Sequence, residues 1–177
     1  MQNNDNPLLI EVLNRMLAKE HACAIRYATH AAMIVGPYVD PVSARFREIA
    51  SDEIAHAGKL RERICALGGT PTMEVDGGER PAAVTLGEMI EANLKEERGA
   101  IEEYSKILQT IPRLNVLLCR TLEDILKDEQ EHLEELMELA PVREGNSSRR
   151  QTRVRLEART GVTAQQPEHI SSLDSRD

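Results

Sequence analysis

The sequence predicts an all-α protein whose main domain is a bundle of four long helices. Apolar residues recur at helical spacing in four long segments of the 177 residues, and strand-like alternation is nearly absent. Short links join the first segment to the second and the third to the fourth, whereas a long Gly- and Pro-rich stretch separates the second from the third. This spacing favours two antiparallel helical hairpins joined by a crossover connection.

Gly and Pro bound the first two helices. The first helix is expected at about residues 5–35, because Gly36 and the proline after it do not continue a helix. The second is expected to begin at Asp40, a plausible N-cap that is followed by Pro at the first helical position. Two glycines from Gly68 onward are expected to stop it.

Capping signals and prolines bound the last two helices. The third is expected to open at a capping box in which Thr85 and Glu88 bond reciprocally to the backbone. Pro112 separates it from the fourth, whose inward stripe is expected to start at Leu114, and Pro141 closes that helix. The 17 residues of the connection 68–84 can extend to roughly 55 Å, enough to cross the bundle and set the third helix parallel to the second.

One pattern of ligand-type side chains occurs twice on the apolar faces of these helices. A lone Glu is followed 33 residues later by a second Glu, and a His comes three residues after that. The two copies, which are 76 residues apart, are Glu20, Glu53 and His56, and then Glu96, Glu129 and His132. On the third helix the apolar periodicity does not choose between Glu96 and Glu97, and the 33-residue interval selects Glu96.

This doubled pattern predicts a site for two metal ions inside the bundle. Four carboxylates in an apolar interior each need a cation or a proton. Glu and His three residues apart project from one helix face, so both can reach the same metal cluster. The oxygen and nitrogen donors suit iron or manganese, with zinc as an alternative. The other interpretation is a helical protein that binds partner proteins and whose carboxylates do not bind metal. The repeated spacing argues against it.

Two aspartates are expected to support the histidines. Asp52 and Asp128 each lie four residues before a His of the pattern. Imidazoles that bind metal normally donate their other N–H to a carboxylate. Asp52 is therefore expected to serve His132, and Asp128 to serve His56, across the bundle. Ordinary acidic surface residues are the alternative.

Tyr27 is a further candidate for the site. It lies two turns beyond Glu20 on the same helix face, where it can hydrogen-bond a ligand carboxylate or donate an electron. A plain core tyrosine is the alternative. The matching position in the second copy is Glu103, so the two halves are expected to differ here.

The composition divides the chain into two parts. Residues 1–140 carry the helical pattern, whereas residues 141–177 are polar, contain seven Arg and are expected to be disordered. The net charge of −8 argues against binding to nucleic acid. The three cysteines are widely spaced, and neither a signal peptide nor a membrane-spanning run is evident. A soluble, cytoplasmic protein is expected.

The four helical segments resemble those of the ferritin superfamily, and most closely the bacterioferritins. The resemblance covers about residues 8–139. It rests on four motifs: Lys-Glu20-His-Ala-Cys-Ala-Ile-Arg-Tyr27, Asp-Glu53-Ile-Ala-His56-Ala, Glu96-Glu-Arg-Gly99-Ala and Asp-Glu129-Gln-Glu-His132. It implies a ferritin-like four-helix bundle that oxidises Fe(II) with O2 or H2O2 at a ferroxidase centre and stores ferric mineral inside a hollow cage of many subunits.

The resemblance also implies roles for individual residues. Two iron ions per chain would be held by Glu20 and Glu96 as terminal ligands, by Glu53 and Glu129 as bridges, and by one His each. Haem is not expected, because haem-binding relatives carry Met where this chain has Ile54, which offers no ligand atom.

The expected assembly is a homo-oligomer, either a cage of 24 or a dimer. A non-storage di-metal oxidase or peroxidase of the rubrerythrin or manganese-catalase type is the alternative function.

Overall fold

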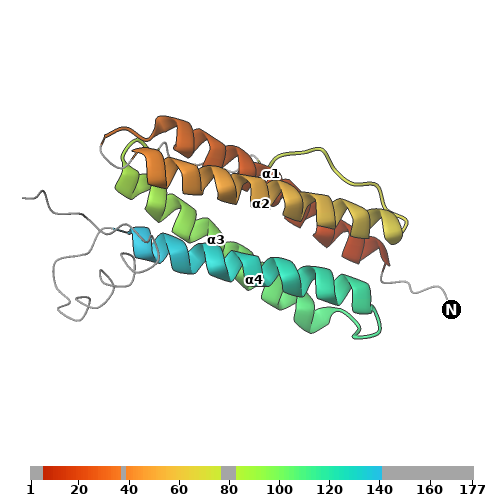
Figure 1. Ribbon diagram of the computed structural model, residues 1–177. Coiled ribbons are helices and arrows are strands. Elements are labelled where there is room, and N and C mark those ends of the chain that lie inside the picture. The colour runs from red at the N-terminus through yellow and green to blue at the C-terminus, as the bar shows by residue number, and fades with distance from the viewer. Residues whose placement is uncertain (1–5, 37–38, 77–82, 141–177) are drawn as a thin grey trace, which may run out of the picture. The chain divides into compact units, whose positions relative to one another are not determined.

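The structure, a computed structural model, describes residues 6–36, 39–76 and 83–140. Its four helices are α1 (Asn6–Met33), α2 (Val39–Ala66), α3 (Leu86–Thr110) and α4 (Val116–Leu139), and the described residues contain no strand (Figure 1). The prediction of an all-α four-helix protein is confirmed. The polar tail predicted for residues 141–177 lies outside the described residues.

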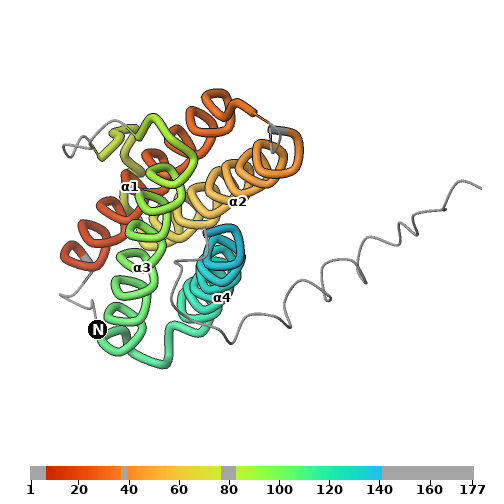
Figure 2. The backbone as a smooth tube through the Cα atoms, turned by 90° about the vertical axis from the view of Figure 1, so that its left-hand side faces the viewer, coloured from red at the N-terminus to blue at the C-terminus, as the bar shows by residue number. Residues whose placement is uncertain are grey.

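The helices form two antiparallel hairpins, α1 with α2 and α3 with α4 (Figure 1). In addition, α1 contacts α3 and α2 contacts α4, and Figure 2 shows these pairs side by side. Helices that run in the same direction therefore lie diagonally across the bundle. Because α2 and α3 run parallel, the connection between them must cross the length of the bundle, as its composition and length predicted.

The described part of this connection is bonded to α1. The side chain of Asn14 donates a hydrogen bond to Thr70 O (3.1 Å) and accepts one from Thr72 N (2.7 Å). Further along, the backbone N–H of Asp76 donates to Ala18 O (2.9 Å). The connection therefore follows α1 toward the end of the bundle where α3 begins (Figure 1).

The predicted helix ends are largely confirmed. Gly36 and Gly68, which follow α1 and α2, have φ angles of 106° and 81°, in the region that glycine adopts without the strain other residues incur. The capping box before α3 is present: Thr85 Oγ1 accepts from Glu88 N (3.3 Å), and Glu88 Oε2 accepts from Thr85 N (2.9 Å). These contacts satisfy backbone groups that a helix leaves without partners.

Two local predictions are wrong. Helix α2 begins one residue before Asp40, which therefore lies in its first turn instead of capping it. Leu114 was expected to face the core, but it lies before α4 and is 95% exposed. The reason is a turn in which Asn115 N donates to Pro112 O (2.9 Å), so that Leu114 sits at the tip of the link between α3 and α4.

The core consists of two apolar clusters on either side of a polar layer. The first contains Leu13, Met16, Leu17, Ala57, Leu60, Ile64, Tyr104, Ile107, Ile111, Leu118, Cys119, Leu122 and Ile125. The second contains Tyr27, Ala31, Ile34, Val42, Phe46, Ile49, Ala50, Met89, Ile90, Leu94 and Leu136. Every helix contributes to both clusters, so each helix also crosses the layer between them. None of the described helices combines the length and the apolar composition that crossing a membrane requires.

The end of α2 offers a test of this packing. A Cβ atom at Gly69 would lie 2.6 Å from Ile10 Cγ2 and 3.0 Å from Ile64 Cγ2. Gly69→Ala should therefore lower the free energy of unfolding by about 1–3 kcal/mol, the usual effect of overpacking. Urea unfolding followed by circular dichroism measures it.

Gly99 provides the matched control. It lies within α3, and nothing lies within 4 Å of a Cβ placed there. Gly99→Ala should raise the free energy of unfolding by about 0.5–1 kcal/mol, because alanine is the better helix former. Equal stabilities for the two variants would contradict the tight packing inferred at Gly69.

Candidate metal centre

A layer of buried acids and histidines separates the two apolar clusters. Each helix contributes to it: Glu20 from α1, Glu53 and His56 from α2, Glu97 from α3, and Glu129 and His132 from α4. None of these six residues is more than 4% exposed. Five of them are residues that the doubled sequence pattern selected.

The sixth is a correction, because Glu97 and not Glu96 faces the interior. Glu97 is 1% exposed, whereas the side chain of Glu96 is 32% exposed and lies 3.6 Å from Arg26 Nη1. Helix α3 buries Asn93, Glu97 and Tyr104, which are four and seven residues apart and so share one face. The interval from Glu97 to Glu129 is therefore 32 residues, one fewer than in the first hairpin.

The assumption of equal intervals selected the wrong residue on α3. The interval includes the link between two helices, and the links of the two hairpins need not have the same length. A different signal was available within the helices. Tyr27 follows Glu20 by seven residues, and Tyr104 follows Glu97 by the same seven. Spacing within a helix fixes which residues share a face, so this comparison identifies Glu97.

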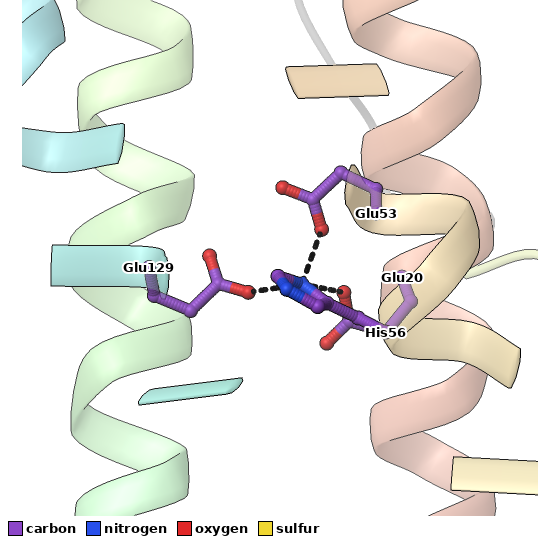
Figure 3. A group of neighbouring side chains, drawn as sticks. All are labelled: Glu20, Glu53, His56 and Glu129. Atoms are coloured by element: carbon purple, nitrogen blue, oxygen red, sulfur yellow. Dashed lines mark ion pairs between the residues drawn. The ribbon is translucent and has the colours of Figure 1, made fainter. Parts of the chain in front are cut away.

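His56 lies at the meeting point of three carboxylates (Figure 3). Its Nδ1 atom is 3.1 Å from Glu129 Oε1, 3.6 Å from Glu53 Oε2 and 3.7 Å from Glu20 Oε2. The three acids come from α4, α2 and α1, so this half of the layer draws on both hairpins.

His132 has the equivalent surroundings in the other half. Its Nδ1 atom is 3.5 Å from Glu53 Oε1, 3.9 Å from Glu97 Oε2 and 3.9 Å from Glu129 Oε2. The two imidazole rings lie 6.0 Å apart between centroids. The layer therefore has two similar halves that share Glu53 and Glu129.

The same division appears when ligand atoms are grouped by distance. One group of ligand atoms within 4.8 Å of one another comes from Glu20, Glu53, His56 and Glu129, and the other from Glu53, Glu97, Glu129 and His132. Four buried atoms of the layer have no hydrogen-bond partner: Glu53 Oε1, Glu129 Oε1, His56 Nδ1 and His132 Nδ1. Buried polar atoms without partners are unfavourable, and two cations would satisfy all four.

The predicted aspartate partners of the histidines are present. His56 Nε2 donates to Asp128 Oδ2 (3.2 Å), and His132 Nε2 donates to Asp52 Oδ2 (3.4 Å). Each bond crosses between α2 and α4. Because Nε2 carries the proton in this bond, Nδ1 keeps its lone pair directed at the carboxylates when the ring is neutral.

A tyrosine supports the lone acid in each half. Tyr27 donates a hydrogen bond to Glu97 Oε1, as expected of a partner to a carboxylate of the site. Tyr104 donates one to Glu20 Oε1. The expectation that the second half lacks such a tyrosine is therefore wrong, because it relied on position 103 and the equivalent position is 104.

Burial controls the ionisation of the layer. It raises the pKa of Glu20 to about 8 and the pKa of Glu129 well above its usual value. Burial alone would lower the pKa of His56, but the facing carboxylates outweigh it and raise that pKa to about 12. Burial likewise opposes ionisation of Glu53, yet the two imidazoles outweigh it and lower its pKa. In the absence of a metal, protons on the imidazoles and on some carboxyls balance the charge.

Ile54 lies on the opposite side of α2 from this layer and is 63% exposed. It provides a hydrocarbon surface there and no ligand atom. The expectation that the chain binds no haem stays a prediction.

Comparisons with known proteins agree with this architecture. A family model for ferritin-like domains matches residues 10–141. A bacterioferritin from Desulfovibrio desulfuricans is 31% identical over 130 residues, which cover 71% of this chain and 70% of the relative. A crystal structure of ferritin-like, diiron-carboxylate proteins from Bacillus anthracis shares 36% identity at a TM-score of 0.73, and the match covers 79% of this chain and 100% of that one.

The solved structure of a D. desulfuricans bacterioferritin shares 26% identity at a TM-score of 0.65, and the match covers 82% of this chain and 95% of that one. The matched family model covers the whole polar layer and all four helices except the first four residues of α1. The chain therefore belongs to the ferritin family, as a ferritin-like four-helix protein related to the bacterioferritins.

Proposed function

We propose that each chain binds two Fe(II) ions in the polar layer and oxidises them to Fe(III) with O2 or H2O2, as the ferroxidase of an iron-storage protein. The observation that carries the proposal is the pair of overlapping ligand groups that share Glu53 and Glu129. Four ligand atoms in these groups are buried without partners, which is the arrangement two bound cations would complete. The sequence similarity to bacterioferritins supports iron as the metal.

The geometry suggests a role for each side chain. Glu53 and Glu129 belong to both groups, so we assign them as bridges between the two metal positions. His56 and His132 each belong to one group and would bind one metal through Nδ1. Glu20 and Glu97 are the terminal carboxylates, and Glu97 replaces Glu96 in this assignment. Carboxylates with one imidazole per metal suit Fe(II), and also Mn(II).

The chain's own residues prepare the layer for this chemistry. Asp52 and Asp128 hold the imidazoles in the orientation that directs Nδ1 inward. The apolar clusters exclude bulk water on both sides, which strengthens the attraction between carboxylates and cations. Two Fe(II) ions would release one electron each, and these two electrons with two protons reduce O2 to H2O2, or H2O2 to two molecules of water.

Apolar side chains on the outer faces of α1 and α2 support association between copies of the chain. Ile25 is 55% exposed and Ile54 is 63% exposed. Both residues lie on helices that pack against each other, and association between copies of the chain would remove such exposed apolar side chains from water. We infer a homo-oligomer, and native mass measurements distinguish a dimer from a cage of 24.

Titration with Fe(II) tests the proposed function. Metal-free protein should bind two Fe(II) per chain under anaerobic conditions and oxidise them on mixing with O2 faster than buffer does. Glu53→Ala removes a proposed bridge and should abolish the rapid phase. If that variant oxidised iron at the unmodified rate, the polar layer would not be the reaction site. Addition of excess iron then separates the two functions, because a storage protein retains a ferric mineral and a di-metal oxidase does not.

A matched pair on α3 tests the corrected ligand. Glu97→Gln should slow the rapid phase at least about tenfold, the lower end of what loss of a supporting contact already costs at metal sites. Glu96→Gln removes the neighbouring acid, which pairs with Arg26 nearer the surface. It should leave the rate within about twofold, since partly exposed ion pairs contribute little. Stopped-flow absorbance measures both rates, and the reverse order would restore Glu96 to the site.

The pKa values predict how the stability of metal-free protein depends on pH. The folded pKa of Glu20 is raised from 4.5 to about 8, so its contribution is favourable below pH 4.5 and is lost as pH rises toward 8. The folded pKa of His56 is raised from 6.5 to about 12, so its contribution is lost as pH rises above 6.5. Both effects have the same sign. The Tm of metal-free protein should therefore fall from pH 5 to pH 8.

Each group changes the free energy of unfolding by at most about 1.4 kcal/mol per pH unit. Calorimetry of protein treated with a chelator measures this dependence. The same scan with Mn(II) bound is the control. Because metal binding requires deprotonated ligands, the bound metal should reverse or flatten the trend. A metal-free Tm that rises from pH 5 to pH 8 would contradict the ionisation described for the layer.

A further inference from the structure

A groove lies between the first half of α1 and the last part of α3, outside the polar layer. It encloses about 950 Å³, which is within the range of small-molecule sites in proteins. Its floor includes Met16, Ile107 and Ile111, which also belong to the first apolar cluster of the core. Leu8 and Leu114 line it at the end of the bundle where α1 begins and α3 finishes, and both are largely exposed (Figure 1).

The two ends of the groove differ in chemical character. Nearer the polar layer, its lining contains three cations and one acid: Arg15, Lys19, Lys106 and Glu103. Lys19 and Glu103 pair with each other from α1 to α3. Toward the other end the lining is largely apolar, with Leu8, Leu9, Ile111, Pro112 and Leu114. Leu8 and Lys19 mark the two ends on α1 and are separated by roughly 16 Å at the rise of an α-helix. The groove is therefore charged at one end and apolar along the rest, as an amphiphile is.

The charge of the lining is opposite in sign to that of the whole chain. The lining holds three cations and one acid, whereas the chain has a net charge of −8. Arg15 pairs with Glu11 at 3.4 Å and Lys106 pairs with Glu102 at 2.6 Å, each within one helix and with all four side chains at least 64% exposed. Exposed pairs of this kind contribute little to stability. Arg15 and Lys106 can therefore turn to a bound anion at small cost.

We propose that this groove binds a long-chain monocarboxylate. Arg15 and Lys106 would hold its carboxylate, and its alkyl chain would lie along the apolar floor toward Leu8. The excess of cations selects a negative head group, because it would repel a cationic amphiphile. Burial of the alkyl chain supplies most of the binding free energy, and the cations supply the choice of head group. The site uses no ligand of the polar layer, so the inference is independent of the proposed function.

Isothermal titration calorimetry of the full-length protein, freed of bound lipid, tests the inference with dodecanoate below its micelle concentration. Two other probes separate the parts of the ligand. Butanoate has the head group with a short chain, and dodecyltrimethylammonium has the long chain with the opposite charge. We expect one dodecanoate per chain, bound at least about tenfold more tightly than either other probe.

A matched pair of lysines tests the head group. Lys106→Gln removes a cation of the groove, and Lys127→Gln removes a lysine of α4 that does not line it. Each lysine pairs with a glutamate one helical turn away at 2.6 Å, and their side chains are 68% and 65% exposed. Lys106→Gln should weaken dodecanoate binding about two- to fivefold, the effect of one exposed ion pair. Lys127→Gln changes the net charge equally and should leave binding unchanged.

A matched pair of leucines tests the alkyl chain. Leu8 lines the groove and is 69% exposed, whereas Leu117 on α4 does not line it and is 68% exposed. Leu8→Ser should weaken dodecanoate binding about threefold or more through lost apolar contact, and Leu117→Ser should leave it unchanged. Because both leucines are mostly exposed, neither substitution should prevent folding, which thermal melting followed by circular dichroism checks.

Four results would overturn the inference, and they point to different alternatives. If dodecanoate does not bind, or binds equally well to Lys106→Gln and Leu8→Ser, the groove is not its site. If dodecyltrimethylammonium binds as tightly as dodecanoate, the groove does not select a carboxylate. If dodecanoate does not bind and Leu8→Ser alone lowers the native mass, the groove is a contact between copies of the chain. If vesicles of phosphatidylglycerol bind and free dodecanoate does not, the groove contacts a membrane surface.

Discussion

The main physical constraint on this structure is that four carboxylates are buried inside a helical bundle, away from water. Glu20, Glu53, Glu97 and Glu129 are each 4% exposed or less, in a layer with apolar side chains on both sides. Ionised groups are tolerated in such surroundings only when opposite charge is supplied. Protons do so in part, as the raised pKa values of Glu20 and His56 show. Two divalent cations would supply enough positive charge to neutralise all four carboxylates. The buried carboxylates are therefore the shared cause of the fold's need for opposite charge and of the proposed metal chemistry.

The layer is also organised by an approximate twofold repeat of the two hairpins. Each hairpin supplies one lone Glu, one Glu that belongs to both ligand groups, and one His. The supporting contacts cross between hairpins: His56 bonds to Asp128, and Tyr104 bonds to Glu20. One Glu and one His of each hairpin are thus held by a residue of the other hairpin. This reciprocity explains why similar side chains recur at equivalent places on all four helices.

The sequence was informative wherever a property depends on spacing within one helix. Such local spacing predicted the pairing of Glu53 with His56 and the capping box at Thr85. It also predicted that Asp52 and Asp128 lie beside the histidines of the facing helix. Prediction failed where it depended on the length or shape of a link. The interval through the α3–α4 link selected Glu96 in place of Glu97, and the turn at Pro112 turned Leu114 outward. The conformation of a link depends on its own turns and length, which helical periodicity does not report.

The assignment of three ligands to each hairpin has a consequence for assembly within the chain. Neither hairpin alone presents a complete ligand group, since each group takes acids from both. A cation bound in the layer would therefore act as a non-covalent crosslink between the hairpins, and its binding free energy would add to the docking of one hairpin on the other. The connection bonded to α1 through Asn14 and Ala18 keeps the second hairpin close and raises its effective concentration. Iron content and the rate at which the hairpins separate should then be inversely coupled, so that an iron-poor cell would hold a population of more readily opened chains.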